Sequence, residues 1–165
     1  MLPIKSRRDH FYENERDYFY KIATSIRKFL LDSEYITGEF YPLFQNWIEK
    51  IRGLPQGKPA RQEFNVPTEN YPPRLEIVEE VSVKPARPAG IERTYFRYEW
   101  GYDNGEKAAQ FPRHAFHSAD DQHPEHHFHQ NGTTDSLVSI NINDPDLHPN
   151  LVEEFFDWLK KYVTP

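Results

Sequence analysis

The sequence has 165 residues and no cysteine. The absence excludes disulfide bonds and every zinc, iron–sulfur or nucleophilic site that depends on a thiolate. It is compatible with a reducing compartment. The chain also lacks an apolar run of about 18 residues, and its first 15 residues have no apolar segment typical of a signal peptide. We therefore expect a cytoplasmic protein that does not span a membrane.

Positive charge is in the minority. The chain has 20 Lys and Arg against 26 Asp and Glu, which gives a formal net charge of −6. This balance argues against broad nucleic-acid binding through bulk electrostatics, although a local basic strip is compatible with it. The sequence also has no glycine-rich phosphate loop, no serine nucleophile motif and no dinucleotide-binding fingerprint. Common nucleotide-binding and hydrolase classes are therefore not indicated.

The first half of the chain predicts two helices followed by a connector. Within residues 8–54, apolar side chains recur at helical spacing in two groups. These are Phe19, Ile22, Ile26, Phe29 and Leu30 in the first, and Phe40, Leu43, Phe44, Trp47, Ile48 and Ile51 in the second. Residues 55–73 contain many prolines, so we expect an extended connector without regular structure.

The second half predicts an antiparallel sheet and a C-terminal helix. We expect about five strands within residues 74–143, at 75–84, 93–100, 106–116, 126–129 and 137–142. In the second strand, strict alternation predicts one face with Thr94, Phe96, Tyr98 and Trp100, and an exposed face with Arg93, Tyr95, Arg97 and Glu99. Residues 149–163 have the apolar stripe of a helix, which we expect to cover the face with Phe96. The expected fold is a single α+β domain over residues 1–165.

Residues 114–129 contain six of the eight histidines. On a strand, His127 and His129 lie on one face and His126 on the other. One hypothesis is a zinc site or another divalent-metal site, in which His127 and His129 bind the ion and a third ligand comes from His114, His117, His123 or a nearby aspartate such as Asp121. No HExxH motif supports it. The alternative is that the histidines are polar loop and edge residues, with no metal or cofactor bound.

A second hypothesis is acid–base cleavage of RNA without a metal. One group deprotonates the 2′-hydroxyl, another protonates the leaving oxygen, and cations stabilise the transition state. The candidate proton-transfer residues are His117, His127, His129, His126 and His114. The candidate substrate-binding residues are Arg93, Arg97 and Arg113 for phosphate, and Tyr95 for stacking on a base. The alternative for this strip is an ordinary solvated sheet face with cross-strand pairs between arginines and Glu99.

The order of motifs in residues 75–163 resembles the TumE-like proteins, bacterial toxins of type II toxin–antitoxin modules. The likeness consists of the strand Tyr95–Trp100, a hairpin, a histidine-containing strand, Pro124 followed by His126-His127-x-His129, and the C-terminal helix. It implies a ribonuclease or another inhibitor of translation, neutralised by an antitoxin such as a helix-turn-helix protein.

The chain departs from the family pattern in three places. Glu125 separates the proline from the histidine pair, residues 113–118 replace an Asp-Asn-Ala-Pro-His-His segment, and the two N-terminal helices are additional. The departures leave two other function classes open. These are a non-catalytic interaction protein and a metal-dependent hydrolase that uses histidine and carboxylate ligands.

Overall fold

The computed structural model describes residues 12–32, 40–66, 74–84, 90–102, 106, 112–118, 127–129 and 151–162. Its elements, in chain order, are α2 (Glu15–Asp32), α3 (Phe40–Arg52), β1 (Ala60–Val66), β2 (Leu75–Lys84), β3 (Gly90–Trp100), β4 (His114–His117), β5 (His127–His129) and α5 (Leu151–Tyr162). The α+β prediction, with two N-terminal helices, an antiparallel sheet and a C-terminal helix, is confirmed. In the described ranges, no helix combines the length and the apolar character needed to cross a membrane.

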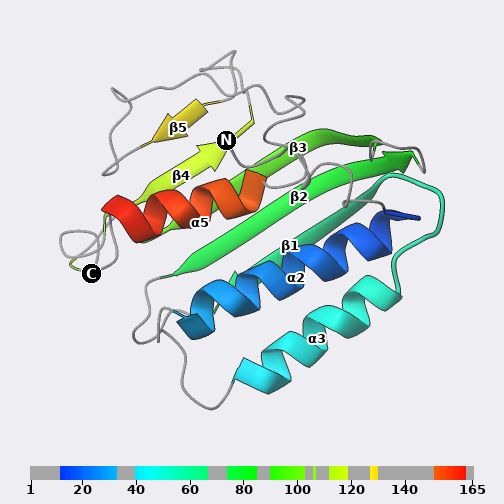
Figure 1. The fold of residues 1–165 in the computed structure, drawn as a ribbon, viewed down its shortest axis with the longest axis horizontal. Coiled ribbons are helices and arrows are strands. Elements are labelled where there is room, and N and C mark those ends of the chain that lie inside the picture. The colour runs from blue at the N-terminus through cyan, green and yellow to red at the C-terminus, as the bar shows by residue number, and fades with distance from the viewer. Residues whose placement is uncertain are drawn as a thin grey trace, which may run out of the picture. The chain divides into compact units, whose positions relative to one another are not determined.

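The strands form one sheet in the order β1-β2-β3-β4-β5 (Figure 1). Strand β2 has the predicted bounds, and β3 begins earlier than predicted, at Gly90. Strand β4 (His114–His117) overlaps the predicted strand 106–116 only at its end, and the prediction was wrong at Glu106, which is helical. Strand β5 covers the described part of the predicted segment 126–129. The predicted strand 137–142 lies outside the described residues.

Strand β1 corrects the prediction of an irregular connector over residues 55–73. Its burial alternates strictly, with Ala60, Gln62, Phe64 and Val66 buried and the intervening residues exposed. The nearest prolines, Pro59 and Pro67, flank the strand and do not interrupt it, so every ladder position keeps its amide hydrogen. The prediction was wrong because the density of prolines in the whole segment obscured a seven-residue alternating run.

The contacts of the chain define two compact units. Unit 1 comprises residues 1–62, 80–94 and 142–165, and unit 2 comprises residues 63–79 and 95–141. Helices α2, α3 and α5 therefore belong to unit 1, while β4 and β5 belong to unit 2. Strands β1, β2 and β3 each contribute residues to both units.

The ends of the N-terminal helices follow from local sequence signals. The side-chain oxygen of Asn14 accepts a hydrogen bond from the Asp17 amide at 3.0 Å, which caps the first turn of α2. At the end of α3, the Gly53 amide donates to the Glu49 carbonyl at 3.1 Å. Glycine is favoured directly after a helix. These signals explain why the two helices have the predicted places.

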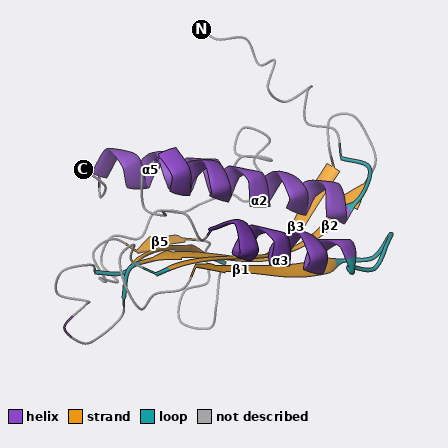
Figure 2. Ribbon diagram, turned by 90° about the horizontal axis from the view of Figure 1, so that it is seen from below, coloured by secondary structure: helices purple, strands orange, loops and turns teal. Residues whose placement is uncertain are grey.

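Helix α2 packs against both other helices of unit 1 (Figures 1 and 2). The rings of Phe29 and Phe156 stack with centroids 4.3 Å apart and planes 2° from parallel. The apolar stripe of α5 is buried over Leu151, Val152, Phe155, Phe156 and Leu159. Its observed partner within unit 1 is thus α2, which the sequence did not indicate. The packing of α5 on Phe96, Tyr98 and Trp100 would join the two units, and it stays a prediction.

The predicted faces of β3 are wrong at its first residues, and Glu99, which we expected on the exposed face, is also buried. Arg93 is buried and Thr94 is exposed, whereas Phe96, Tyr98 and Trp100 are buried as expected. The Arg93 guanidinium donates to the Tyr18 hydroxyl at 3.0 Å and lies over the Tyr18 ring. A charged side chain can be buried when such a partner satisfies it. Arg93 is therefore a structural residue of unit 1 and no part of an exposed strip.

Replacing Phe156 by alanine should destabilise the protein by about 3–5 kcal/mol, because it removes a buried ring and its stacked contact with Phe29. Urea denaturation at pH 7 measures this cost. The control is Tyr41→Ala, which truncates a side chain that is 67% exposed and should change stability by less than about 0.5 kcal/mol. Equal effects of the two substitutions would contradict the packing of α5 on α2.

Candidate functional site

The register of the last three strands aligns one arginine and two histidines. Arg97 on β3 lies opposite His117 on β4, and His117 lies opposite His127 on β5. Directly opposed residues of antiparallel strands are on the same face of the sheet. Arg97, His117 and His127 therefore form a row across three strands of unit 2.

A second row follows two positions along each strand. Glu99 lies opposite Ala115, and Ala115 lies opposite His129. Because residues two apart in a strand lie on the same face, the two rows share one side of the sheet. We call this side the polar face, with Arg97, Glu99, Ala115, His117, His127 and His129. By this register, His117, His127 and His129 occupy positions on the same side of the sheet, as strand alternation predicts, and their catalytic role stays a prediction.

The other side of these strands is apolar. Tyr98 lies opposite Phe116, and Phe116 lies opposite Phe128. His114 also belongs to this side, opposite Trp100, and is only 3% exposed. Burial lowers the pKa of His114 to about 4, so its ring is neutral at pH 7. The structure thus separates His114 from the other candidate histidines.

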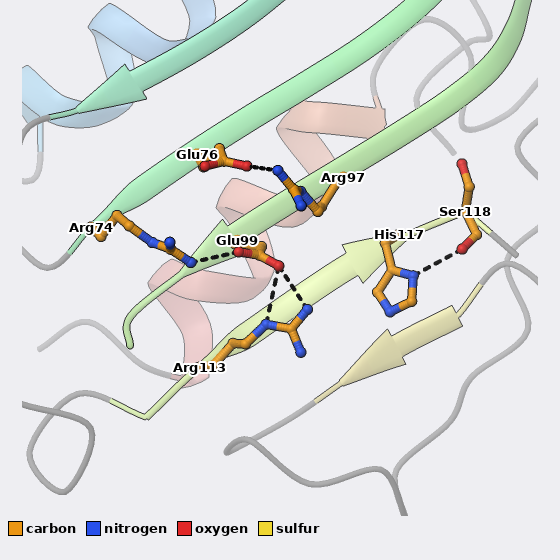
Figure 3. A network of polar contacts seen from close by, with 7 residues as sticks. All are labelled: Arg74, Glu76, Arg97, Glu99, Arg113, His117 and Ser118. Atoms are coloured by element: carbon orange, nitrogen blue, oxygen red, sulfur yellow. Dashed lines mark hydrogen bonds and ion pairs between the residues drawn. The ribbon is translucent and has the colours of Figure 1, made fainter. Parts of the chain in front are cut away.

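Glu99 of the polar face binds two arginines, Arg74 and Arg113. This carboxylate is 5% exposed. It accepts from Arg74 at 2.6 Å through one oxygen and from Arg113 at 2.7 and 3.1 Å through the other. Figure 3 shows Glu99 between the two guanidinium groups. The predicted cross-strand pairing of an arginine with Glu99 is present, and it holds Arg113 in a defined orientation.

Arg97 has its own carboxylate partner, Glu76 on β2 (Figure 3). Burial would lower the pKa of Arg97, but the charges of Glu76 and Glu99 outweigh it, so the pKa is raised and the group stays cationic. The buried Nε atoms of Arg74 and Arg97 have no hydrogen-bond partner among the described residues. Three arginines and two glutamates leave this network with one positive charge in excess.

The His117 ring has a defined tautomer. Its Nδ1 lies 2.8 Å from the Ser118 carbonyl oxygen (Figure 3). A carbonyl oxygen can only accept, so Nδ1 carries a hydrogen, and in the neutral ring Nε2 has the lone pair. In this tautomer Nε2 is the atom that takes a proton or binds a metal.

Ser118 also anchors the end of β4. Its hydroxyl accepts from the Phe96 amide at 2.8 Å, and its own amide donates to the Phe96 carbonyl at 2.9 Å. These bonds hold the segment that carries His117 in register with β3. The sequence analysis did not identify Ser118, because its partner is distant in the chain and no local pattern indicates it.

Of the other predicted site residues, the structure describes Tyr95 but not His123, His126 or Asp121. Tyr95 is half-buried at the start of the β3 segment of unit 2. His123, His126 and Asp121 lie outside the described residues. A search of the described part of the chain finds no group of three or more His, Asp or Glu arranged to hold a metal ion. The sequence analysis did not identify Arg74 or Glu76. The alternation of side chains along β2 could have suggested that Glu76 faces an arginine of the neighbouring strand β3.

Comparison with models of protein families, with curated proteins and with solved structures finds no match to this chain. The likeness to TumE-like toxins therefore rests on the sequence motifs alone.

The buried neutral His114 should make stability depend on pH. The unfolded chain takes up a proton near pH 6.5 and the folded chain only near pH 4, so stability is lost as pH falls through this window. Between pH 7 and 5 the loss should be about 2 kcal/mol. Urea denaturation of wild type and His114→Phe at both values measures it. A variant that loses as much stability as wild type between pH 7 and 5 would contradict this role.

Replacing Glu99 by glutamine should cost about 1–3 kcal/mol, because it removes the charge that both Arg74 and Arg113 bind while keeping the shape. Thermal or urea denaturation measures the loss. The control is Glu106→Gln, which neutralises an exposed carboxylate of the same unit and should have little effect. If both variants are as stable as wild type, the network does not hold the polar face together.

Proposed function

We propose that the protein is a ribonuclease toxin of a toxin–antitoxin module, related to the TumE-like family, and that the polar face of unit 2 is its active site. The observation that supports the proposal most directly is the cross-strand row of Arg97, His117 and His127. It combines a cation with two imidazole side chains, a type that can serve as acid or base, on strands that the sequence likeness also selects.

The chemistry requires two proton transfers at one phosphate. His117 Nε2 takes the proton of the RNA 2′-hydroxyl, and the 2′-oxygen attacks the adjacent phosphorus. The bond from phosphorus to the 5′-oxygen breaks, and a protonated histidine, His127, gives its proton to that oxygen. The products are a 2′,3′-cyclic phosphate and a 5′-hydroxyl. Opposed positions on antiparallel strands have Cβ atoms about 4.5–5.5 Å apart, so both histidines can serve one phosphate.

The arginines supply the electrostatic part of the reaction. The phosphorane gains negative charge, which preorganised donors stabilise without further reorganisation. Glu76 and Glu99 orient Arg97 and Arg113 before a substrate binds. The excess of one positive charge matches a single phosphate group. Tyr95, two residues before Arg97 on the same strand, is the residue that we expect to stack on a neighbouring base.

Alanine at His117 or His127 should slow cleavage of a short RNA by about 10²–10⁴-fold, because each change removes a proton-transfer group. The assay contains a chelator, and a substrate with a 2′-deoxy residue at the cleavage site should be inert. Melting temperatures should stay close to that of wild type. The control is Lys58→Ala, which removes an exposed cation of unit 1 and should cleave like wild type.

The same variants test the biological part of the proposal. Induced wild-type protein should arrest bacterial growth, and the His117→Ala, His127→Ala double variant should not. Co-expression of a helix-turn-helix protein encoded beside the toxin should relieve the arrest. Wild-type protein that neither cleaves RNA nor arrests growth would refute the proposal, as would a fully active double variant.

A further inference from the structure

We propose that the groove between α2 and α5 binds a small zwitterion of the α-amino acid type. The groove has a volume of about 160 Å³, and both of its walls belong to unit 1. Its lining consists of Ser25, Lys28 and Phe29 from α2 and of Glu153, Phe156, Asp157 and Lys160 from α5. The inference goes beyond the ribonuclease proposal and does not depend on it, because the polar face belongs to unit 2.

Two contacts between the helices define the groove. The Ser25 hydroxyl donates a hydrogen bond to the Glu153 carboxylate at 3.0 Å. One turn further along both helices, the rings of Phe29 and Phe156 stack with centroids 4.3 Å apart. The two helices therefore run in the same direction beside the groove. Residues three or four positions apart on each helix then line the same wall.

Lys28 and Asp157 are the charges of the groove that have no partner within the described part of the chain. Both side chains are exposed and line the groove, yet neither makes a hydrogen bond or an ion pair with another described residue. Opposite charges that share a groove without pairing suit a ligand with a negative group for one and a positive group for the other. A zwitterion has both groups.

The surroundings of Asp157 favour a positive group at that end of the ligand. Glu153 lies one turn before Asp157 on the same helix. The pKa of Glu154 is raised by partial burial and by the negative charges of Asp157 and Glu153. An ammonium group bound to Asp157 reduces the repulsion among these carboxylates.

The lysines of the groove provide the site for a carboxylate. Lys160 lies over the Phe29 ring, with its Nζ atom 5.9 Å from the centroid, and Lys28 is one position before Phe29 on α2. The lining thus has two lysines and two carboxylates, and its net charge is zero. A phosphate ion meets repulsion from the carboxylates, and a polyamine meets repulsion from the lysines. A zwitterion has a partner for each of its charges.

The size of the groove limits the ligand. An enclosed apolar cavity of about 150 Å³ holds a benzene molecule, so the groove of about 160 Å³ accommodates an amino acid with a short side chain. Phe29 and Phe156 provide its apolar part, whereas every other lining residue is polar or charged. We therefore choose L-valine as the probe, because it combines both charges with a small apolar group.

Titration of isotope-labelled, full-length protein with L-valine at pH 7, followed by NMR, tests the site. Wild type should show saturable shifts of amide signals from α2 and α5 beside the groove. Lys28→Gln and Asp157→Asn should each weaken binding by about 5-fold, because each removes one exposed ionic contact. The matched control is Lys161→Gln, which removes an exposed lysine of α5 outside the groove and should bind like wild type.

Two results of this titration would overturn the proposal. One is wild-type protein without saturable shifts beside the groove. The other is a Lys28→Gln, Asp157→Asn double variant that binds L-valine as tightly as wild type.

A second measurement uses wild type alone, so it does not depend on the folding of a variant. Isovalerate has the carboxylate and the branched chain of L-valine without its ammonium group, and isobutylamine has the ammonium group and the branched chain without the carboxylate. Each should bind about 5-fold more weakly than L-valine. If either binds as tightly as L-valine, the site does not recognise a zwitterion. Neither readout contains RNA, so an inactive nuclease and an absent zwitterion site would be distinguished.

Discussion

The antiparallel register of β4 with β3 and β5 decides which side chains of unit 2 meet. Side chains alternate between the two faces of a strand, so a slip by one residue would move His117 to the apolar side and bring His114 to the polar face. The paired hydrogen bonds between Ser118 and Phe96 oppose such a slip at the end of β4. Both the composition of the polar face and the burial of His114 follow from this one constraint.

The buried carboxylate of Glu99 links the stability of the polar face to its chemistry. Removing a carboxylate from water is costly unless cations and hydrogen bonds compensate, and Arg74 and Arg113 do so here. The same contacts restrict the guanidinium groups, so little conformational freedom remains to be lost when an anion binds. The network therefore stabilises unit 2 and orients its cations at the same time.

In unit 1, helix α2 makes the contacts on which the other elements depend. Its buried face supplies an aromatic partner to Phe156 and a hydroxyl acceptor to Arg93, and the Glu15 carboxylate accepts the Val83 amide at 3.1 Å. The periodicity of residues 15–32 predicted this helix because an apolar stripe is a local pattern. The partners are distant in the chain, so neither the stacking on α5 nor the burial of Arg93 could be deduced from it.

The sequence by itself determined the two N-terminal helices, the C-terminal helix, the bounds of β2 and the common face of His127 and His129. These features depend on periodicity or on signals from adjacent residues. Only the tertiary structure decided that Arg93 and His114 are buried, that residues 60–66 form a strand, and that Glu99 lies between Arg74 and Arg113. Alternation distinguishes the two faces of a strand, but the segments that pack on each face decide which one is buried and which charges become neighbours.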